Sequence, residues 1–168
     1  MRLTEAVDMT SATGLLYAME EARYATRGKL LIWAAIPCTG GCLRNQQNWA
    51  RWSRSGYTAG LKRIQQQWDK FYELWENVVQ LAEWAIADRQ AIIAIEWPRQ
   101  CAYWKDPCVN EFIDKHEMVP ANFDGCMYGL ECKKPWTVFT NCHELATGLA
   151  GRSCASIRAN TLQCMAKT

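Results

Sequence analysis

The sequence lacks the segments that would place it in a membrane or mark it for secretion. It has no run of about 18 or more apolar residues, so no transmembrane helix is expected. Residues 1–6 lack the apolar core of a signal peptide. The net charge of +2 provides no broad electrostatic attraction to nucleic acid or to acidic membranes. We therefore expect an intracellular protein, nuclear or cytoplasmic, that is not secreted and has no membrane partner.

The sequence also lacks the short motifs of several common enzyme classes. It contains neither a phosphate-binding Gly-x-x-x-x-Gly-Lys loop nor the Gly-x-Ser-x-Gly motif of hydrolases. His143 and Glu144 begin like a zinc-protease helix, but Thr147 stands where that helix requires its second histidine. No internal repeat or low-complexity segment is visible. These absences exclude P-loop enzymes, hydrolases of that type, zinc proteases and repeat proteins.

Cysteine, by contrast, is abundant: the chain of 168 residues has nine, an odd number. Disulfide scaffolds are normally short secreted chains, so without a signal peptide we expect reduced thiols. Several cysteines lie in or beside apolar segments, where a free thiol behaves as a small hydrophobic side chain. We expect no metal, and the alternative is a small structural zinc module with the ligands Cys132, Cys142, His143 and Cys154.

Two apolar runs predict strands of a parallel sheet. Leu30–Ile36 ends at Pro37 and Cys38, and Ala91–Ile95 ends at Glu96. Continuous apolar runs bounded by Pro and Gly are typical of strands that are buried on both faces. Because ligands of open α/β sheets bind beyond the carboxyl ends of the strands, we expect Cys38 and Glu96 to be neighbours that open onto one cavity.

Helical signals surround these two strands. The clearest is Leu61–Ala87, in which apolar residues recur at spacings of three and four. A helix over Asp8–Ala25 is expected to begin at a cap and to end before Gly28. Asp106 before Pro107 predicts the start of a short helix that runs to His116. The segment His143–Leu149 predicts a last helical turn.

The C-terminal third predicts an antiparallel hairpin. Two strands, Asn122–Gly129 and Pro135–Asn141, would be joined by a turn at Leu130–Lys134, at the edge of the sheet. The order of elements is that of a single α/β domain over residues 1–150. Residues 151–168 have weak periodicity, and we expect a weakly ordered C-terminal tail.

The segment between the two apolar runs, residues 38–60, combines basic and aromatic side chains. Its polar composition predicts a long loop or an irregular helix, and such segments are often functional. Cations beside aromatic rings suit single-stranded nucleic acid, although a solvated surface and burial of the rings are the alternatives. The residues that we assign to nucleic acid are Arg44, Trp49, Arg51 and Trp52, with Arg54, Tyr57, Lys62 and Arg63 nearby.

Cys38 and Glu96 are the two candidate catalytic residues. A cysteine is a strong nucleophile once the pKa of its thiol is lowered, and an inert half-buried thiol is the alternative. Glu96 can act as an acid–base group or can bind the amino edge of a base. Its alternative role is an ion pair with Arg99 or Lys105.

These motifs and their order resemble the catalytic half of DNA cytosine-5 methyltransferases. Pro37-Cys38-Thr39 corresponds to the Pro-Cys-Gln motif of that family, and Glu96-Trp97-Pro98 corresponds to its Glu-Asn-Val motif. Asp124–Gly129 and Trp136–Phe139 are similar to its paired edge strands. Thr39 replaces the Gln, Trp97-Pro98 replaces Asn-Val, and no Gly-rich donor-binding strand precedes Leu30.

The resemblance implies a Rossmann-like, methyltransferase-type open sheet that is mostly parallel, has an antiparallel edge hairpin and is incomplete. In that family the cysteine attacks a flipped-out cytosine, the glutamate holds the base, and S-adenosylmethionine donates the methyl group. Lys133 and Lys134 would contact phosphate, and a partner chain could supply the missing half. We therefore expect a divergent or degenerate module that acts on or binds nucleobases, with a catalytically silent interaction protein of the same fold as the alternative.

Overall fold

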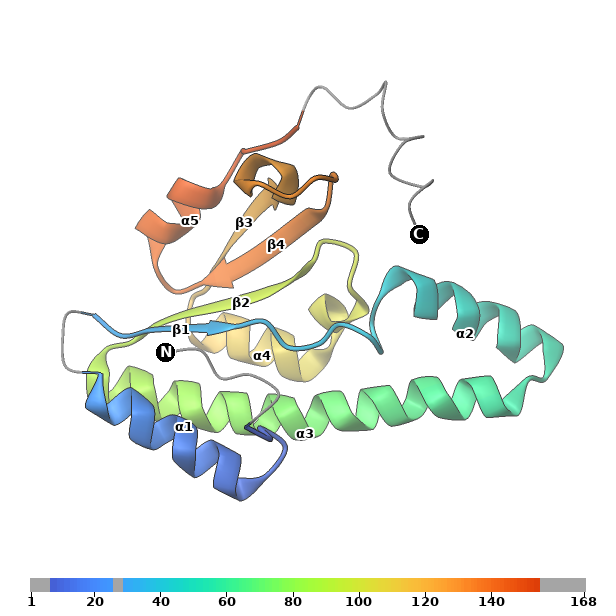
Figure 1. Cartoon of the computed structure of the whole chain (residues 1–168), viewed down its shortest axis with the longest axis horizontal. Coiled ribbons are helices and arrows are strands. Elements are labelled where there is room, and N and C mark those ends of the chain that lie inside the picture. Colours follow the sequence, from blue (N-terminus) through green and yellow to red (C-terminus); the bar gives the residue numbers. More distant parts are fainter. Residues whose placement is uncertain (1–6, 26–28, 155–168) are drawn as a thin grey trace.

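Four strands form one open mixed sheet in the computed structural model, which describes residues 7–25 and 29–154 (Figure 1). The order across the sheet is β1-β2-β4-β3. β1 and β2 are parallel, whereas β4 is antiparallel to both of its neighbours. The strands are β1 (Leu31–Ala34), β2 (Ile92–Pro98), β3 (Val119–Asp124) and β4 (Pro135–Thr140).

The predicted α/β class and the edge hairpin are confirmed, but the sheet is not mostly parallel. β3 and β4 form the hairpin, which places β3 at one edge. The predicted bounds of its first strand, Asn122–Gly129, are wrong, because the strand covers Val119–Asp124 and Gly125–Tyr128 forms a 3-10 helix. β4 then lies beside β2 in the antiparallel direction, with Glu96 opposite Val138. One parallel pair thus remains, because the hairpin occupies the side of β2 where another parallel strand would pair.

The helices begin where local sequence signals predict. The Ser11 hydroxyl accepts a hydrogen bond from the Gly14 N–H (3.0 Å), and Asp106 caps the helix that starts at Pro107. Gly28, the predicted end of the first helix, lies outside the described residues. The helices are α1 (Ala12–Tyr24), α2 (Leu43–Ser55), α3 (Thr58–Arg89), α4 (Pro107–Lys115) and α5 (His143–Leu149), with short 3-10 helices η1 (Ala102–Lys105) and η2 (Gly125–Tyr128).

The segment predicted as a long loop or irregular helix is a helical hairpin. α2 is a regular helix that ends at Gly56, whose left-handed φ of 68° turns the chain directly into α3. Glycine adopts this conformation at low cost, which is why the turn can be so tight. In Figure 1, α2 lies alongside the N-terminal half of α3, away from the sheet.

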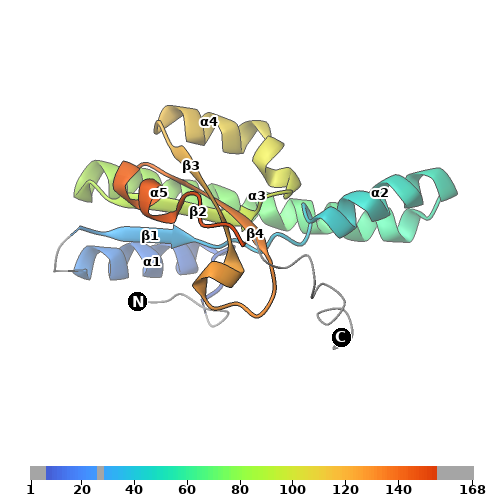
Figure 2. The ribbon, with the colours of Figure 1, turned by 90° about the horizontal axis from the view of Figure 1, so that it is seen from above.

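Helices cover the two faces of the sheet unequally. α3 and α4 bury their apolar side chains against β2, and α1 packs on α3 through Leu15, Ala18 and Leu81. α5 lies on the other face, over β3 and β4, where Leu145 and Leu149 pack against the sheet (Figures 1 and 2). None of the helices in the described ranges combines the length and the apolar composition needed to cross a membrane.

Burial on both faces is confirmed for β2 and wrong for β1. Ile93, Ala94 and Ile95 are almost completely buried. In β1, Leu31 is 47% exposed and Trp33 is 40% exposed. The reason is that β1 lies at an edge of the sheet. On the face opposite to α3 and α4, α5 covers only the half that β3 and β4 form.

The start of the predicted C-terminal tail is attached to β3. The Gly151 N–H donates to the Asn122 carbonyl, and the Cys154 N–H donates to the Asp124 carboxylate (3.0 Å). This backbone hydrogen bond, together with nearby Lys133, holds the pKa of the buried Asp124 carboxyl below its usual value. Residues 155–168 lie outside the described part of the chain.

Truncation of the central aromatic core is expected to cost much of the stability of the fold. Phe71 is 1% exposed and contacts Trp75, Trp97 and Tyr103, so Phe71→Ala should lower the free energy of unfolding by about 3–5 kcal/mol. Leu16→Ala, at an exposed position of α1, should change it by less than about 0.5 kcal/mol. Urea unfolding of both variants measures this difference, and equal effects would contradict the assigned core.

Candidate functional site

Glu96 lies within β2, because this strand continues past Ile95 to Pro98. The prediction that Glu96 ends the strand is therefore wrong. Trp97 forms part of the core on the opposite face, and its indole N–H donates to the Ile36 carbonyl (2.8 Å). The Glu96 carboxylate accepts a hydrogen bond from the indole N–H of Trp33 at 3.0 Å, a partner that differs from the predicted Arg99 or Lys105.

Cys38 is half-buried against the core, beside the end of β1. Burial raises the pKa of the Cys38 thiol and Cys42 raises it further; Lys134 and a backbone hydrogen bond oppose this shift, and Glu96 makes the smallest contribution, which raises the pKa. The cavity next to the end of β1, about 590 Å³, is lined by Pro37 but by neither Cys38 nor Glu96. The environment of Cys38 therefore does not activate its thiol.

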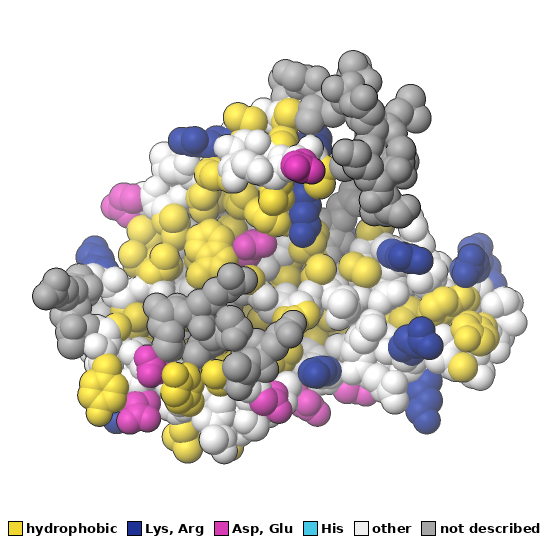
Figure 3. All heavy atoms as spheres, in the orientation of Figure 1, with side chains coloured by type: hydrophobic (Ala, Val, Ile, Leu, Met, Phe, Trp, Pro, Cys, Tyr) yellow, Lys and Arg dark blue, Asp and Glu magenta, His cyan; other side chains and the backbone are white. Residues whose placement is uncertain are grey.

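The α2–α3 hairpin gathers positive charge at the end of the molecule away from α1. From Leu30 to Trp68 the chain has no Asp or Glu. Because the whole chain carries only +2, this is a local concentration of cations rather than a general property (Figure 3). The basic side chains of this region are all exposed, and they are Arg44, Arg51, Arg54, Lys62 and Arg63.

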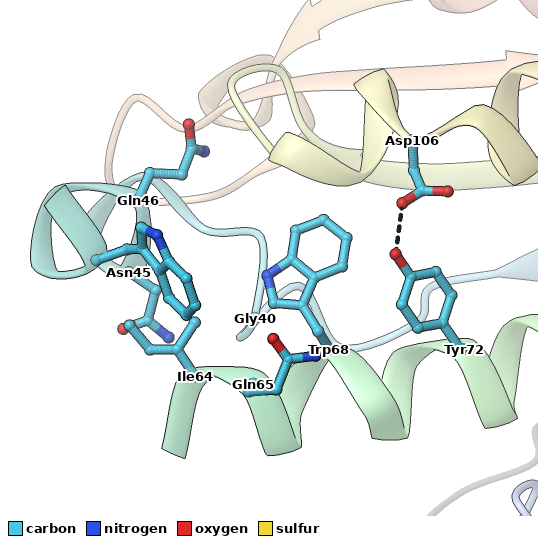
Figure 4. A pocket seen from close by; sticks show the side chains of 9 residues that line it. Gly40, Asn45, Gln46, Ile64, Gln65, Trp68, Tyr72 and Asp106 are labelled. Carbon is cyan, nitrogen blue, oxygen red and sulfur yellow. Dashed lines mark hydrogen bonds between the residues drawn. The ribbon is translucent and has the colours of Figure 1, made fainter. Parts of the chain in front are cut away.

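A cavity of about 460 Å³ opens between α2, α3 and the loop at Gly40 (Figure 4). Trp49, Trp68 and Tyr72 supply aromatic walls. This volume lies within the usual range of small-molecule pockets. Ile64 adds an apolar side chain to the lining, and the polar side chains are those of Asn45, Gln46, Gln65 and Asp106.

Hydrogen bonds from distant segments fix the polar residues that α2 contributes to the cavity. Asn45 Nδ2 donates to the Thr39 carbonyl (2.6 Å) and to Gln67 Oε1 (2.7 Å). Gln46 Nε2 donates to two backbone carbonyls, those of Gly41 and Gln100, both at 2.8 Å. These bonds connect α2 to α3 and to the end of β2, so the cavity has a defined shape.

On the opposite side, Tyr72 and Asp106 form a hydrogen-bonded pair (Figure 4). The Tyr72 hydroxyl donates to Asp106 Oδ2 at 2.8 Å. Burial and the adjacent carboxylate raise the pKa of Tyr72 to about 12, so its hydroxyl stays protonated at neutral pH. Asp106 also accepts from the Cys108 N–H, which ties this wall to the start of α4.

The glycines after Cys38 permit the close packing beneath this cavity. A Cβ atom at Gly40 would lie 2.5 Å from the Tyr103 hydroxyl, and one at Gly41 would lie 2.8 Å from the Tyr103 ring. Larger residues would therefore push the loop away from the core. The two glycines thus hold the loop close to Tyr103.

The structure separates the predicted nucleic-acid residues into two groups. Arg44, Trp49, Arg51 and Trp52 all belong to α2. Trp49 lines the cavity and is 42% exposed. Trp52 instead packs edge-to-face on Tyr57, with a centroid distance of 5.4 Å, and supports the turn between the helices.

Lys133 and Lys134 belong to the other group, in the connection between η2 and β4. Lys133 forms an ion pair with Asp124 (3.4 Å), and the Lys134 ammonium lies 4.9 Å from the centroid of the Trp136 ring. Both lysines thus have partners within the protein. The polar lining of the cavity was not predicted from the sequence, and the glutamine run at residues 65–67 of α3 was the available signal.

The predicted zinc ligands do not come together. In the part of the chain that the structure describes, no group of three or more His, Cys, Asp or Glu side chains is arranged to hold a metal ion. Cys142 contacts Glu144 instead, at 3.3 Å. All eight described cysteines are free thiols.

Comparison with known proteins adds no relative. No protein-family model matches the chain, and neither a curated protein nor a solved structure shows a significant match. The functional argument therefore depends on the geometry alone.

The raised pKa of Cys38 predicts slow alkylation. At neutral pH, iodoacetamide should modify Cys38 more slowly than the exposed Cys132, because Cys38 is half-buried and its raised pKa leaves less of the reactive thiolate. The rate at Cys38 should increase as the pH rises above 9. Peptide mass spectrometry after timed labelling measures both rates, and faster labelling of Cys38 than of Cys132 at neutral pH would contradict this assignment.

Proposed function

We propose that the protein binds single-stranded nucleic acid along the α2–α3 hairpin. The observation that carries this proposal is the set of exposed cations on two helices that also line an aromatic cavity, in a segment without any acidic residue from Leu30 to Trp68. Cations of this kind pair with phosphates, and aromatic rings stack on bases. Arg44, Arg51 and Arg54 would contact the backbone, and Trp49 would stack on a base.

The cavity favours a single strand over a duplex. Its walls include the rings of Trp49 and Trp68, and a base can reach such rings only when it is unpaired and turned outward. Stacking of this type contributes about 1–3 kcal/mol for each base. A duplex could use only the cations, and its binding would be weaker at a given salt concentration.

Removal of two cations should weaken binding and change its salt dependence. For Arg51→Ala/Arg54→Ala, we expect weaker binding and a slope of log K against log salt that is shallower by about 1.4, since each phosphate contact on a single strand contributes about 0.7. Fluorescence anisotropy with a labelled oligonucleotide at several salt concentrations gives both quantities.

The matched control is Arg23→Ala/Lys29→Ala, which removes the same charge near the end of α1, far from α2 (Figure 1). This control should retain the wild-type slope. Equal slopes for all three proteins, or no binding by the wild-type protein even at low salt, would refute the proposal.

A narrower, second proposal comes from the resemblance to DNA cytosine-5 methyltransferases. In it, the sheet is part of a Rossmann-like, methyltransferase-type fold that a partner chain completes. The Cys38 thiolate adds to C6 of cytosine, Glu96 holds the base, and S-adenosylmethionine donates the methyl group. The observation that favours it is the parallel pairing of β1, which leads toward Cys38, with β2, which carries Glu96. It ranks second for two reasons. Burial raises the pKa of Cys38, and the Glu96 carboxylate already accepts a hydrogen bond from the indole N–H of Trp33.

Covalent trapping tests this second proposal. An oligonucleotide with 5-fluorocytosine, supplied with S-adenosylmethionine, should form a covalent adduct with the wild-type protein and none with Cys38→Ala. Denaturing gel electrophoresis and mass spectrometry detect the adduct. Its absence from the wild-type protein, or its persistence in Cys38→Ala, would exclude Cys38 as the nucleophile.

A further inference from the structure

The cavity between α2 and α3 supports an inference about which bases the protein prefers, and this inference rests on the proposed function above. We propose that the cavity takes one unpaired base that carries an exocyclic amino group, such as cytosine, and disfavours uracil and thymine. The preference follows from the hydrogen-bond donors and acceptors of the lining that are not already used within the protein.

Asn45 and Gln46 offer only acceptors to a ligand. A side-chain amide nitrogen has two hydrogens. Both hydrogens of Asn45 Nδ2 are donated within the protein, and so are both hydrogens of Gln46 Nε2. The carbonyl oxygens of these two side chains are their remaining polar atoms, and an oxygen of this type can only accept.

Gln65 and Asp106 add further acceptors. Gln65 Nε2 donates to Asp69 Oδ1 (2.9 Å), and in Figure 4 the Gln65 oxygen points toward Gly40 and Trp68. Asp106 is a carboxylate, whose two oxygens accept from Tyr72 and from the Cys108 N–H and keep further lone pairs. Acceptors are therefore contributed by Asn45, Gln65 and Asp106, whereas the Gln46 amide points away from the other lining side chains in Figure 4.

Donors are fewer than acceptors in this lining. Trp49 and Trp68 each carry one indole N–H, and one hydrogen of Gln65 Nε2 is uncommitted. The Tyr72 hydrogen is already donated to Asp106. The lining thus favours a ligand with several N–H groups on one edge.

This pattern distinguishes cytosine from uracil. The two bases have nearly the same shape, but cytosine carries an amino group with two donor hydrogens where uracil carries a carbonyl acceptor, and uracil keeps one donor, the N3–H, where cytosine has an acceptor. In an acceptor-rich cavity, that carbonyl would face other oxygens and would lose its hydrogen bond to water without replacement. Adenine and guanine also carry an amino group, whereas thymine shares the carbonyl pattern of uracil.

The aromatic wall is rigid enough for such discrimination. Trp68 packs edge-to-face on Phe71 and on Tyr103, with centroid distances of 5.8 and 4.7 Å. A fixed ring holds the plane of a stacked base, and the base edge then faces the same polar groups each time. Selectivity among bases requires this fixed geometry, since stacking alone tolerates every base.

The test compares oligo-dC and oligo-dU of about 12 nucleotides, whose backbones carry equal charge. Anisotropy titrations in mildly alkaline buffer, which keeps oligo-dC unfolded, should show about tenfold tighter binding of oligo-dC to the wild-type protein. Gln65→Leu removes the acceptor that faces Gly40 together with one uncommitted donor hydrogen, and should reduce this ratio about threefold or more. The matched control is Gln66→Leu, an exposed neighbour that does not line the cavity, and it should keep the wild-type ratio.

The possible outcomes separate this inference from the proposed function. Salt-dependent binding with equal affinity for the two oligonucleotides would overturn the base preference and leave nucleic-acid binding intact. If Gln65→Leu and Gln66→Leu have the same ratio of oligo-dC affinity to oligo-dU affinity, the preference arises elsewhere in the protein, and this result would also overturn the inference. Absence of binding to both oligonucleotides would refute the proposed function itself. Thermal unfolding confirms that both variants, which change exposed side chains, remain folded.

Discussion

The stacking of Phe71 on Tyr103 is the contact on which the rest of the structure depends. The two rings are nearly parallel, with a centroid distance of 3.7 Å and an angle of 11° between their planes. Phe71 comes from α3 and Tyr103 from η1, the turn that directly follows β2. Trp97 and Trp75 pack around the same pair. This aromatic cluster fixes α3 on the sheet and also supports the glycine loop that forms one wall of the cavity.

The length of α3 explains why a cavity exists beyond the sheet. With 32 residues, α3 is about 48 Å long, whereas the 7 residues of β2 span about 23 Å. The sheet can therefore bury only part of this helix, from about Trp68 onward. The preceding turns pack against α2, in which no residue is fully buried. A polar helix packed on a partly apolar one leaves a groove that is open to solvent, while the exposed arginines of α2 lie on other faces of that helix.

Local signals in the sequence predicted much of this fold. The apolar stripe of α3, the cap at Asp106 and the hairpin of β3 and β4 depend on neighbouring residues, and the structure confirms them. Burial across the sheet depends on partners that are distant in sequence. Trp33, expected in the core, is half exposed because β1 lies at an edge, whereas Trp97 is buried because β2 continues past Glu96.

The candidate site was predictable to a smaller extent, for the same reason. The basic and aromatic composition of α2 indicated Trp49 and its neighbouring arginines without knowledge of the helix. The roles of Asn45 and Gln46 depend on carbonyl partners in other segments, and no pattern within α2 reveals those partners. Cys38 and Glu96 were predicted to follow directly after the ends of their strands. Because β2 continues to Pro98, Glu96 instead lies within the strand and accepts a hydrogen bond from Trp33.

The measurement that tests the central claim most directly is an NMR titration of ¹⁵N-labelled protein with a short single-stranded oligonucleotide. Indole N–H signals report separately on the hairpin, through Trp49 and Trp68, and on the sheet edge, through Trp33, which donates to Glu96. Binding in the α2–α3 cavity predicts large shifts for Trp49 and Trp68 and little change for Trp33. Shifts confined to Trp33, with Trp49 and Trp68 unaffected, would contradict the account.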